Sequence, residues 1–500
     1  MRLTLPITPP PATRRRVRIL AMVAALLAIA WVADVPQAAL ADSDEPGVEQ
    51  LIDLDVARAR LGDALPTGRG VVMGHVEGHN GKYMPNVERN RFQGVTFVPR
   101  SGDSEPMGHA QATASIIYGR HGLAPGVETV HSFSTTGWLS TQYLYTGMPR
   151  QPGSDRIDVL NHSWIAHEQE HTLEMLHRTD AAVDRLDAII VGGVNNRRGT
   201  RVPALMASGY NVIAVGAHRG TSSGGFTRFD GEGRAKPDIA GPRDLTSFAT
   251  PVVSAVAAIL VEAANALEPA EDAARARRAP TIKAALMAGA TKPWNWRQRD
   301  GRPLDEYLGA GVVNVDQSLR ILDAGPVAPE QSHVGYGWDF REIERDGAVV
   351  YELQADEPVG ELSAVLTWHR RVSTRLARHP ATRRPALALE PRLARMELEL
   401  VYIAPDGREG VIAESRSAID NVQHVYLEDA PPGRYRLRVI RLDDEHEEAW
   451  EYAVAWRVGE KVPYRGERKD EEAAEEADAA EPTDVEVDLE QVDAEPREED

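Results

Sequence analysis

The chain has 500 residues, a length typical of two or three domains, and no cysteine, which excludes disulfides, thiol nucleophiles and cysteine-ligated zinc. Its net charge of −20 is uneven, because residues 470–500 carry 16 acidic residues and one arginine, whereas residues 42–469 have a net charge of only −9. With no basic patch left, nucleic acid is not expected as a partner.

The first 41 residues predict a bacterial-type secretory signal peptide. A basic segment at Arg14–Arg18 precedes the apolar run Ile19–Ala33 and a small-residue cleavage site at Ala39–Ala41. The run is short for a membrane span, so no stable span is expected after cleavage. We therefore expect export to the periplasm or beyond the cell. A twin-arginine signal and an uncleaved anchor are the alternatives.

Residues 42–325 alternate between apolar strands and helical patterns, after a lead-in helix at Val48–Leu61. A buried strand is predicted at Val71–Gly78, with His75 and Glu77 on one face, and a helix of small residues at Gly108–Ile117 that begins with His109. The following strands and the clearest helix are predicted at Ile157–Trp164, Leu186–Val191, Tyr210–Ala217 and Glu168–Leu186. This alternation predicts a parallel sheet with helices on both faces and a site at the carboxyl ends of its strands.

The segment Thr246–Pro251 leads into the largely apolar run Val252–Leu267. Proline suits a first helical turn, and apolar residues all round predict a helix at the centre of the domain. Ser247 then lies at the helix amino terminus, where free amide groups can stabilise an oxyanion. By itself, such a serine would be taken as a helix cap.

Together, these blocks resemble the subtilisin-like serine proteases over residues 45–325, in the order acid, histidine, serine. The resemblance implies that Ser247 is the nucleophile, His109 its base and Glu77 the group that orients the histidine. It also implies that Asn195 donates to the oxyanion and that the strand end Asn161, His162, Ser163 and Trp164 binds the substrate backbone. Further matching segments are Lys236–Pro242 and Gly309–Asn314.

Three positions depart from the family pattern. The family has aspartate at the position of Glu77 and glycine at the position of Leu245, and Asn196 next to Asn195 offers a second oxyanion candidate. The resemblance thus predicts a secreted serine endopeptidase that acts on protein or peptide substrates. The alternative is a catalytically weak or inactive binding protein with the same fold. No cofactor is expected to be required. The resemblance also allows structural calcium, for which the sequence assigns no ligands.

A second motif, His167-Glu168-Gln169-Glu170-His171, matches the H-E-x-x-H pattern of zinc proteases, and His177 has the spacing of a third ligand. On an unbroken helix His167 and His171 would lie about 40° apart and His177 about 80° off on the far side, at roughly 100° per residue. With no helix breaker between them, an exposed polar helix is the favoured interpretation and zinc the remote alternative.

After a linker at Asp323–Gln331, short alternating strands predict an antiparallel β-sandwich over residues 326–465. It resembles the jelly-roll domains attached to many secreted subtilisin-like proteases. The strands are predicted at Ala348–Leu353, Glu361–Trp368, Met396–Ile403, Tyr435–Ile440 and Trp450–Trp456. Residues 466–500 are acidic and of low complexity, so they are expected to be disordered.

Overall fold

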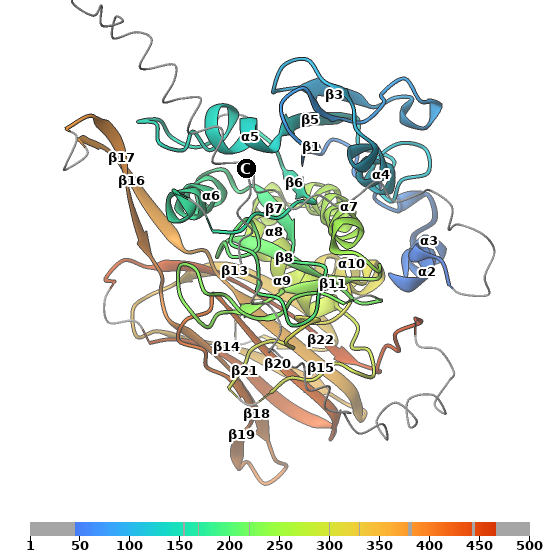
Figure 1. Cartoon of the computed structure of the whole chain (residues 1–500). Coiled ribbons are helices and arrows are strands. Elements are labelled where there is room, and N and C mark those ends of the chain that lie inside the picture. The colour runs from blue at the N-terminus through green and yellow to red at the C-terminus, as the bar shows by residue number, and fades with distance from the viewer. Residues whose placement is uncertain are drawn as a thin grey trace, which may run out of the picture.

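The computed structural model describes residues 46–466, except 154–155, 169, 220, 300, 330, 379–382 and 443–445. The predicted signal peptide and the acidic tail beyond Gly466 lie outside the described residues. Figure 1 shows an α/β region, coloured blue to yellow-green, beside a region of long antiparallel strands coloured orange to red.

A seven-stranded parallel sheet lies at the centre of the α/β region, in the order β11-β8-β7-β6-β1-β5-β3. The strands are β1 (Val72–Glu77), β3 (Thr96–Pro99), β5 (Thr129–Ser134), β6 (Val159–His162), β7 (Ile189–Gly193), β8 (Val212–Ala217) and β11 (Ile239–Gly241). From β1 the chain passes to the edge strand β3 and returns to β5 on one side, and from β6 it proceeds outward through β7, β8 and β11 on the other. These two strands therefore flank the switch point, where open parallel sheets form their ligand crevice.

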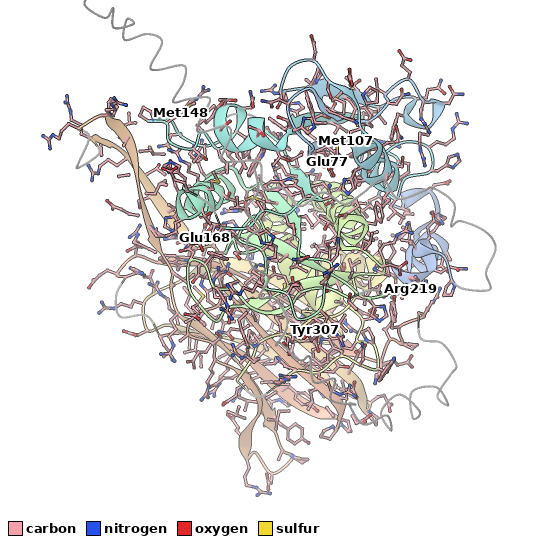
Figure 2. All side chains as sticks on the ribbon, in the orientation of Figure 1. Glu77, Met107, Met148, Glu168, Arg219 and Tyr307 are labelled. Carbon is pink, nitrogen blue, oxygen red and sulfur yellow. The ribbon has the colours of Figure 1, made fainter. Side chains whose placement is uncertain are left out.

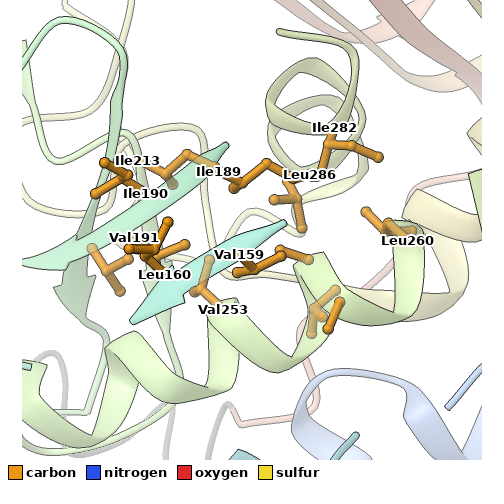
Figure 3. Close-up of a cluster of buried hydrophobic side chains, with 14 of the residues drawn as sticks. Val159, Leu160, Ile189, Ile190, Val191, Ile213, Val253, Leu260, Ile282 and Leu286 are labelled. Atoms are coloured by element: carbon orange, nitrogen blue, oxygen red, sulfur yellow. The ribbon is translucent and has the colours of Figure 1, made fainter. Parts of the chain in front are cut away.

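Helices cover this sheet, and the apolar helix α7 (Thr246–Asn265) packs against β6, β7, β8 and β11. Figure 3 shows side chains of α7 and of α9 (Ala279–Gly289) gathered around those of β6, β7 and β8. The other helices are α2 (Val48–Leu51), α3 (Leu54–Leu61), α4 (Gly108–Ile117), α5 (Thr135–Gly137), α6 (Thr172–Leu186), α8 (Ala270–Ala276) and α10 (Val315–Asp323). The predicted α/β fold is confirmed.

Short elements complete the α/β region. They are the helical turns η1 (Gly62–Ala64), η2 (Asn90–Phe92) and η3 (Trp138–Gln142) and the strands β2 (Lys82–Met84), β4 (Glu105–Pro106), β9 (Gly225–Phe226) and β10 (Ala235–Lys236). In the described part of the chain, α7 is the one helix long and apolar enough to cross a membrane. Because 83% of its most apolar window is buried inside the fold, its composition is explained by the core.

Two β-sheets follow α10, and their facing side chains share a second core. One sheet has the order β12-β14-β21-β18-β19 and the other β13-β22-β15-β20. Their strands are β12 (Ser332–His333), β13 (Tyr336–Ile343), β14 (Ala348–Ala355), β15 (Val359–Thr367), β18 (Met396–Ile403), β19 (Glu409–Ser415), β20 (Val422–Ala430), β21 (Gly433–Arg441) and β22 (Trp450–Gly459). Nearly all pairings are antiparallel, as expected for the predicted sandwich.

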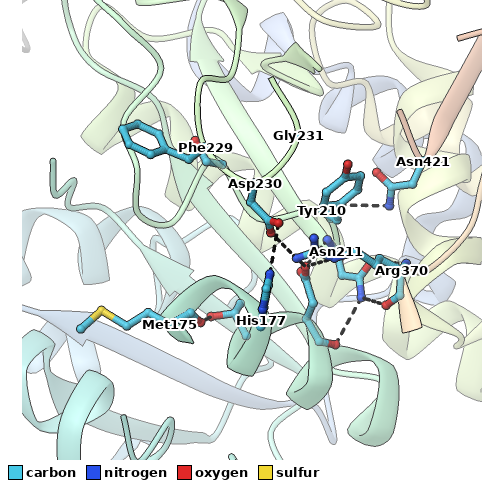
Figure 4. Close-up of polar contacts among 12 residues, drawn as sticks. Met175, His177, Tyr210, Asn211, Phe229, Asp230, Gly231, Arg370 and Asn421 are labelled. Atoms are coloured by element: carbon cyan, nitrogen blue, oxygen red, sulfur yellow. Dashed lines mark hydrogen bonds and ion pairs between the residues drawn. The ribbon is translucent and has the colours of Figure 1, made fainter. Parts of the chain in front are cut away.

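The sandwich is fused to the α/β region. Helix α9, whose residues are all buried, packs against β15 and β22, so the four-stranded sheet is covered on its outer face as well. Arg457 of β22 donates from Nε to the carbonyl oxygen of Ala288 at 2.9 Å and pairs with buried Glu361. Arg370 donates from Nε to Asp180 of α6 at 2.9 Å, and its backbone exchanges two hydrogen bonds with Asn211 (Figure 4).

Several elements differ from those predicted. The lead-in helix is split into α2 and α3 because Asp53 has a left-handed φ of 53° and accepts a hydrogen bond from Asn314. Helix α6 begins at Thr172, not near Glu168, because His171 has a left-handed φ of 71°. Sequence analysis also missed the hairpin formed by β16 (Arg371–Arg378) and β17 (Pro385–Arg392), which projects past α6 (Figure 1).

Candidate active site

Glu77 is the last residue of β1, beside the point where the strand order reverses. The next residue, Gly78, has φ +52°, and a Cβ there would lie 2.2 Å from the carbonyl oxygen of Lys82, so the turn requires glycine. Glu77 is only 1% exposed and lies beside Met107, the residue that precedes α4 (Figure 2). A carboxylate buried to this extent needs a partner.

His109, in the first turn of α4, is that partner. Its Nδ1 lies 3.0 Å from Oε2 of Glu77. The negative charge of Glu77 raises the pKa of His109 and outweighs the opposite effect of burial. Burial by itself would raise the pKa of Glu77, but the charge and hydrogen bond of His109 outweigh it, and that pKa is lowered. Both shifts describe an ionised carboxylate that stabilises a protonated imidazole.

Thr113 contacts the other carboxylate oxygen. Its Oγ1 lies 3.1 Å from Oε1 of Glu77, so α4 supplies a partner to each oxygen. Sequence analysis did not identify Thr113. The available signal was its position four residues after His109, which places both side chains on one face of the helix.

Ser247 is the second residue of α7 and is 6% exposed. The ring of the next residue, Phe248, stacks on His109 with centroids 6.1 Å apart, so the start of α7 and the start of α4 lie side by side. Among the described residues, neither the hydroxyl nor the backbone N–H of Ser247 has a hydrogen-bond partner. The hydroxyl is therefore not bonded to His109 here, although catalytic hydrogen bonds often tighten only when substrate binds.

The two neighbouring asparagines after β7 have different surroundings. Oδ1 of Asn196 accepts hydrogen bonds from the backbone N–H of Thr246 at 2.8 Å and from its hydroxyl at 2.7 Å. Asn196 thus caps α7. Asn195 exchanges backbone hydrogen bonds with Ser223, but its side-chain amide makes none within the described chain. The amide of Asn195 is accordingly the one that a ligand can use.

Leu245, where the family has glycine, is the residue immediately before α7. Its φ of −121° is extended, which any residue adopts, so the leucine brings no backbone strain to this turn. Its carbonyl oxygen accepts the hydrogen bonds of Phe248 and Ala249 and so starts the helix.

The predicted substrate-binding residues Asn161, His162, Ser163 and Trp164 form the carboxyl end of β6 and the turn after it, and their side chains are buried. Asn161 accepts from the Ser254 hydroxyl and donates to Ser163. The ring of His162 lies 4.5 Å from that of Trp138, and burial lowers its pKa to about 3. Ser163 and Trp164 make no backbone hydrogen bond in the described chain, so their main-chain groups are free to pair with an extended peptide.

The three histidines of the alternative zinc motif do not converge. His167 precedes α6, His171 contacts Glu170 and Glu174, and Nε2 of His177 lies 3.1 Å from Asp230. The helix is also not the exposed polar one expected, because Met175, Leu176 and Val183 are among its buried residues. Figure 2 places Glu168 well apart from Glu77.

Across the described residues, no group of three or more His, Asp or Glu side chains is placed to hold a metal ion. The structure therefore assigns no carboxylate ligand set to the calcium that the resemblance allows.

The family model described as the Subtilase family matches residues 72–311, which include β1, α4, β6, β7 and the start of α7. This segment is a subtilase domain. No curated protein matches the chain. One similar solved structure is described as the crystal structure of tripeptidyl peptidase 2 (TPP II), with 12% identity, a TM-score of 0.31 and a match over 70% of this chain. The chain spans 40% of the length of that structure's chain.

The match of residues 72–311 to the Subtilase family supports a serine peptidase function in general. The recognition made from the ordered sequence blocks is thereby confirmed.

Proposed function

We propose that this subtilase is an endopeptidase that cleaves peptide bonds through an acyl-enzyme on Ser247. His109 takes the proton of the Ser247 hydroxyl as the oxygen attacks the scissile carbonyl, and then gives it to the leaving amine. Glu77 holds Nδ1 of His109 and stabilises the imidazolium that forms. Water then attacks the ester, with His109 again as base, and releases the second product.

The developing oxyanion is stabilised by two donors in this proposal: the side-chain amide of Asn195 and the backbone N–H of Ser247. Both lack a partner among the described residues, and the N–H lies at the positive end of α7. One such donor contributes about 3 kcal/mol to the transition state in related chemistry. The free main-chain groups of Ser163 and Trp164 would hold the substrate extended.

The observation that carries the proposal is the 3.0 Å contact between buried Glu77 and His109 next to the amino terminus of α7. A buried carboxylate costs free energy unless it is paired. Its pairing with an imidazole, with a serine at the adjacent helix terminus, is an arrangement that acyl transfer requires and that a packing role does not.

A cleavage assay on an unfolded protein substrate tests the proposed reaction. We expect peptides produced by internal cuts, identified by mass spectrometry, and no cuts with Ser247→Ala. Ser140→Ala, which removes a hydroxyl far from the predicted site in sequence, should cleave like the wild type. Products released only from a chain end would contradict the endopeptidase assignment, and equal cutting by Ser247→Ala would contradict the nucleophile.

Two observations favour a second candidate, a binding protein that retains the cleft. The Ser247 hydroxyl has no hydrogen bond to His109, and the acid is glutamate instead of the family's aspartate. Such a protein would bind an extended peptide along Ser163 and Trp164 without cutting it. Saturable peptide binding by the wild type, with no cleavage product on prolonged incubation, would support this candidate.

We also propose that residues 1–41 direct export. The support is the basic segment, the apolar run and the small residues at Ala39–Ala41. Amino-terminal sequencing of the protein secreted from a bacterial host should begin near Asp42. Recovery of the chain with Met1 intact in the membrane fraction would favour the uncleaved anchor.

A further inference from the structure

Behind the pair of Glu77 and His109 lies another histidine, which the proposed mechanism does not use. His75 precedes Glu77 by two residues on β1, so both side chains leave the same face of the strand. Its Nε2 lies 3.1 Å from Oγ1 of Thr113, and its Nδ1 lies 3.4 Å from the hydroxyl of Tyr118. His75, Thr113 and Tyr118 are all fully buried, and Thr113 in turn contacts Glu77.

The hydrogens of these groups can be arranged in one order that leaves no group unsatisfied. If the Tyr118 hydroxyl donates to Nδ1, the hydrogen of neutral His75 is on Nε2 and is donated to Oγ1 of Thr113. The single hydrogen of Thr113 then goes to Oε1 of Glu77 in preference to the carbonyl oxygens of His109 and Ala110, which lie 3.1 and 3.3 Å from Oγ1, because an ionised carboxylate is the stronger acceptor. In the other tautomer, Nε2 would compete with Glu77 for that one hydrogen, and a buried carboxylate oxygen would lose its donor.

The protonation states of His75 and Tyr118 agree with this arrangement of hydrogens. Burial lowers the pKa of His75 to about 4, so the ring is neutral near pH 7. Burial also raises the pKa of the Tyr118 hydroxyl well above its usual value, and it therefore remains a donor.

We propose that Tyr118, His75 and Thr113 form a directed chain of hydrogen bonds that holds the Glu77 carboxylate in place for His109. They are positioning residues, since none touches the reacting atoms. The inference rests on the proposed function, in which Glu77 orients the catalytic base.

The arrangement also accounts for glutamate at this position. A glutamate side chain has one more rotatable bond than aspartate, and a longer carboxylate must be fixed at both oxygens to hold one orientation. Here α4 contacts both, through Nδ1 of His109 and Oγ1 of Thr113, while β1 supports Thr113 through His75.

Thr113→Val in the full chain is the first test, because it keeps the shape and removes the donor. We expect kcat to fall by about 10- to 100-fold with little change in KM, as for other small misplacements of a catalytic group. Thr113→Ser, which keeps the hydroxyl, should recover most of the activity. Wild-type kcat in Thr113→Val would overturn the proposal.

A pH profile separates positioning from a merely structural effect. Without its Thr113 donor, Glu77 is more basic and stabilises the His109 imidazolium further, so the acid limb of kcat should move to higher pH by up to about one unit. The titratable groups that face Glu77 and His75 are His109, Tyr118 and His162. A lower Tm with an unmoved acid limb would assign Thr113 to folding alone.

A proton NMR measurement makes the test independent of catalysis. The Nδ1–H of His109, bonded to Glu77, should give a far-downfield resonance that Glu77→Gln abolishes and Thr113→Val shifts or broadens. If the wild type shows this resonance but cleaves nothing, the proposed function fails while the hydrogen-bond chain stands. If Thr113→Val leaves the resonance unchanged in an active enzyme, only the chain is refuted.

Tyr118→Phe covers the case in which Thr113→Val does not fold, since it keeps the ring and removes only one hydroxyl at the far end of the hydrogen-bond chain. The proposal predicts a smaller loss of kcat than for Thr113→Val and non-additive losses when both are combined. Fully additive losses would show that the two residues act separately and would contradict a connected chain.

Discussion

The proposed acyl transfer depends on one pair of side chains, Glu77 and His109. The carboxylate is buried, its partner is the imidazole at 3.0 Å, and the pKa shifts of the two groups have opposite directions. Glutamate in place of the family's aspartate is accommodated because Thr113 contacts the second oxygen. The substitution is therefore consistent with a working catalytic group.

The first prediction concerns Glu77→Gln. The amide keeps the size but cannot stabilise the imidazolium, and it favours the wrong tautomer of His109. We expect kcat to fall by about 10⁴-fold, as when the acid of a comparable triad is neutralised. The matched control is Glu88→Gln, which makes the same change at an exposed position and should leave kcat unchanged. Equal activity of both variants would contradict the role of Glu77.

The second prediction concerns pH. His109 must be neutral to act as a base, and Glu77 raises its pKa, so activity should rise through a pKa above the ordinary histidine value of 6.5. In Glu77→Gln the raising charge is gone while burial still lowers the pKa, so the residual activity should have its acid limb at lower pH. A shift to higher pH in that variant would contradict the pairing.

At the same scale, the sequence predicts that Glu77, His109 and Ser247 belong to one site, because each has a characteristic neighbourhood. The structure places Glu77 against His109 and the start of α7 beside them. The sequence was not sufficient to identify Thr113, because a threonine at this position looks like any other small residue in a packed helix. The distinction between Asn195 and Asn196 also required coordinates, because adjacent residues differ only in where their side chains point.

At the scale of elements, the start of α7 depends on a cap from another segment. No side chain of the helix itself caps it, and Asn196, which follows β7, supplies the acceptor for Thr246. The cap fixes the helix terminus that carries Ser247 and links it to the segment after β7 that carries Asn195.

The third prediction separates the two asparagines. Asn196→Ala removes a cap and should lower the free energy of unfolding by about 1 kcal/mol. Asn195→Ala should leave Tm unchanged and lower kcat by about 10²- to 10³-fold, because it removes a proposed oxyanion donor. Thermal melts and initial rates on both variants provide the check. The reverse pattern would assign the oxyanion to Asn196.

Elements with strong periodicity were predicted closely, and those without it were not. Helix α4 has the bounds expected from its small residues, and β18 matches the expected strand. The β16–β17 hairpin was missed because each of its strands buries only one residue, so no alternating apolar pattern marks it. The break between α2 and α3 depends on a contact with distant Asn314, which local sequence does not contain.

At the scale of the whole molecule, the subtilase domain and the sandwich share a buried contact surface. Helix α9 is buried between them, and Arg457 and Arg370 cross the boundary to buried acceptors. Sequence analysis predicted the two regions and the linker between them. It did not predict this fusion, because the mostly apolar helix α9 resembles any core helix and the polar contacts across the boundary join residues far apart in the sequence.

The fourth prediction concerns truncation after residue 325. Without the sandwich, α9 loses its covering sheet and exposes an apolar surface, which is unfavourable at about 25 cal/mol per Å². We expect the fragment 42–325 to aggregate or to bind a hydrophobic dye and be digested rapidly by an added protease. A soluble, monomeric fragment with a cooperative thermal transition would show that the two regions fold independently.

Active-site labelling tests the central claim most directly. A fluorophosphonate reacts with a serine only where a base activates the hydroxyl and an oxyanion site accepts the phosphoryl oxygen. We predict that the wild-type chain is labelled, that peptide mapping locates the adduct on Ser247, and that Ser247→Ala and His109→Ala are not labelled. A folded wild-type protein that remains unlabelled, or an adduct on another serine, would contradict the account.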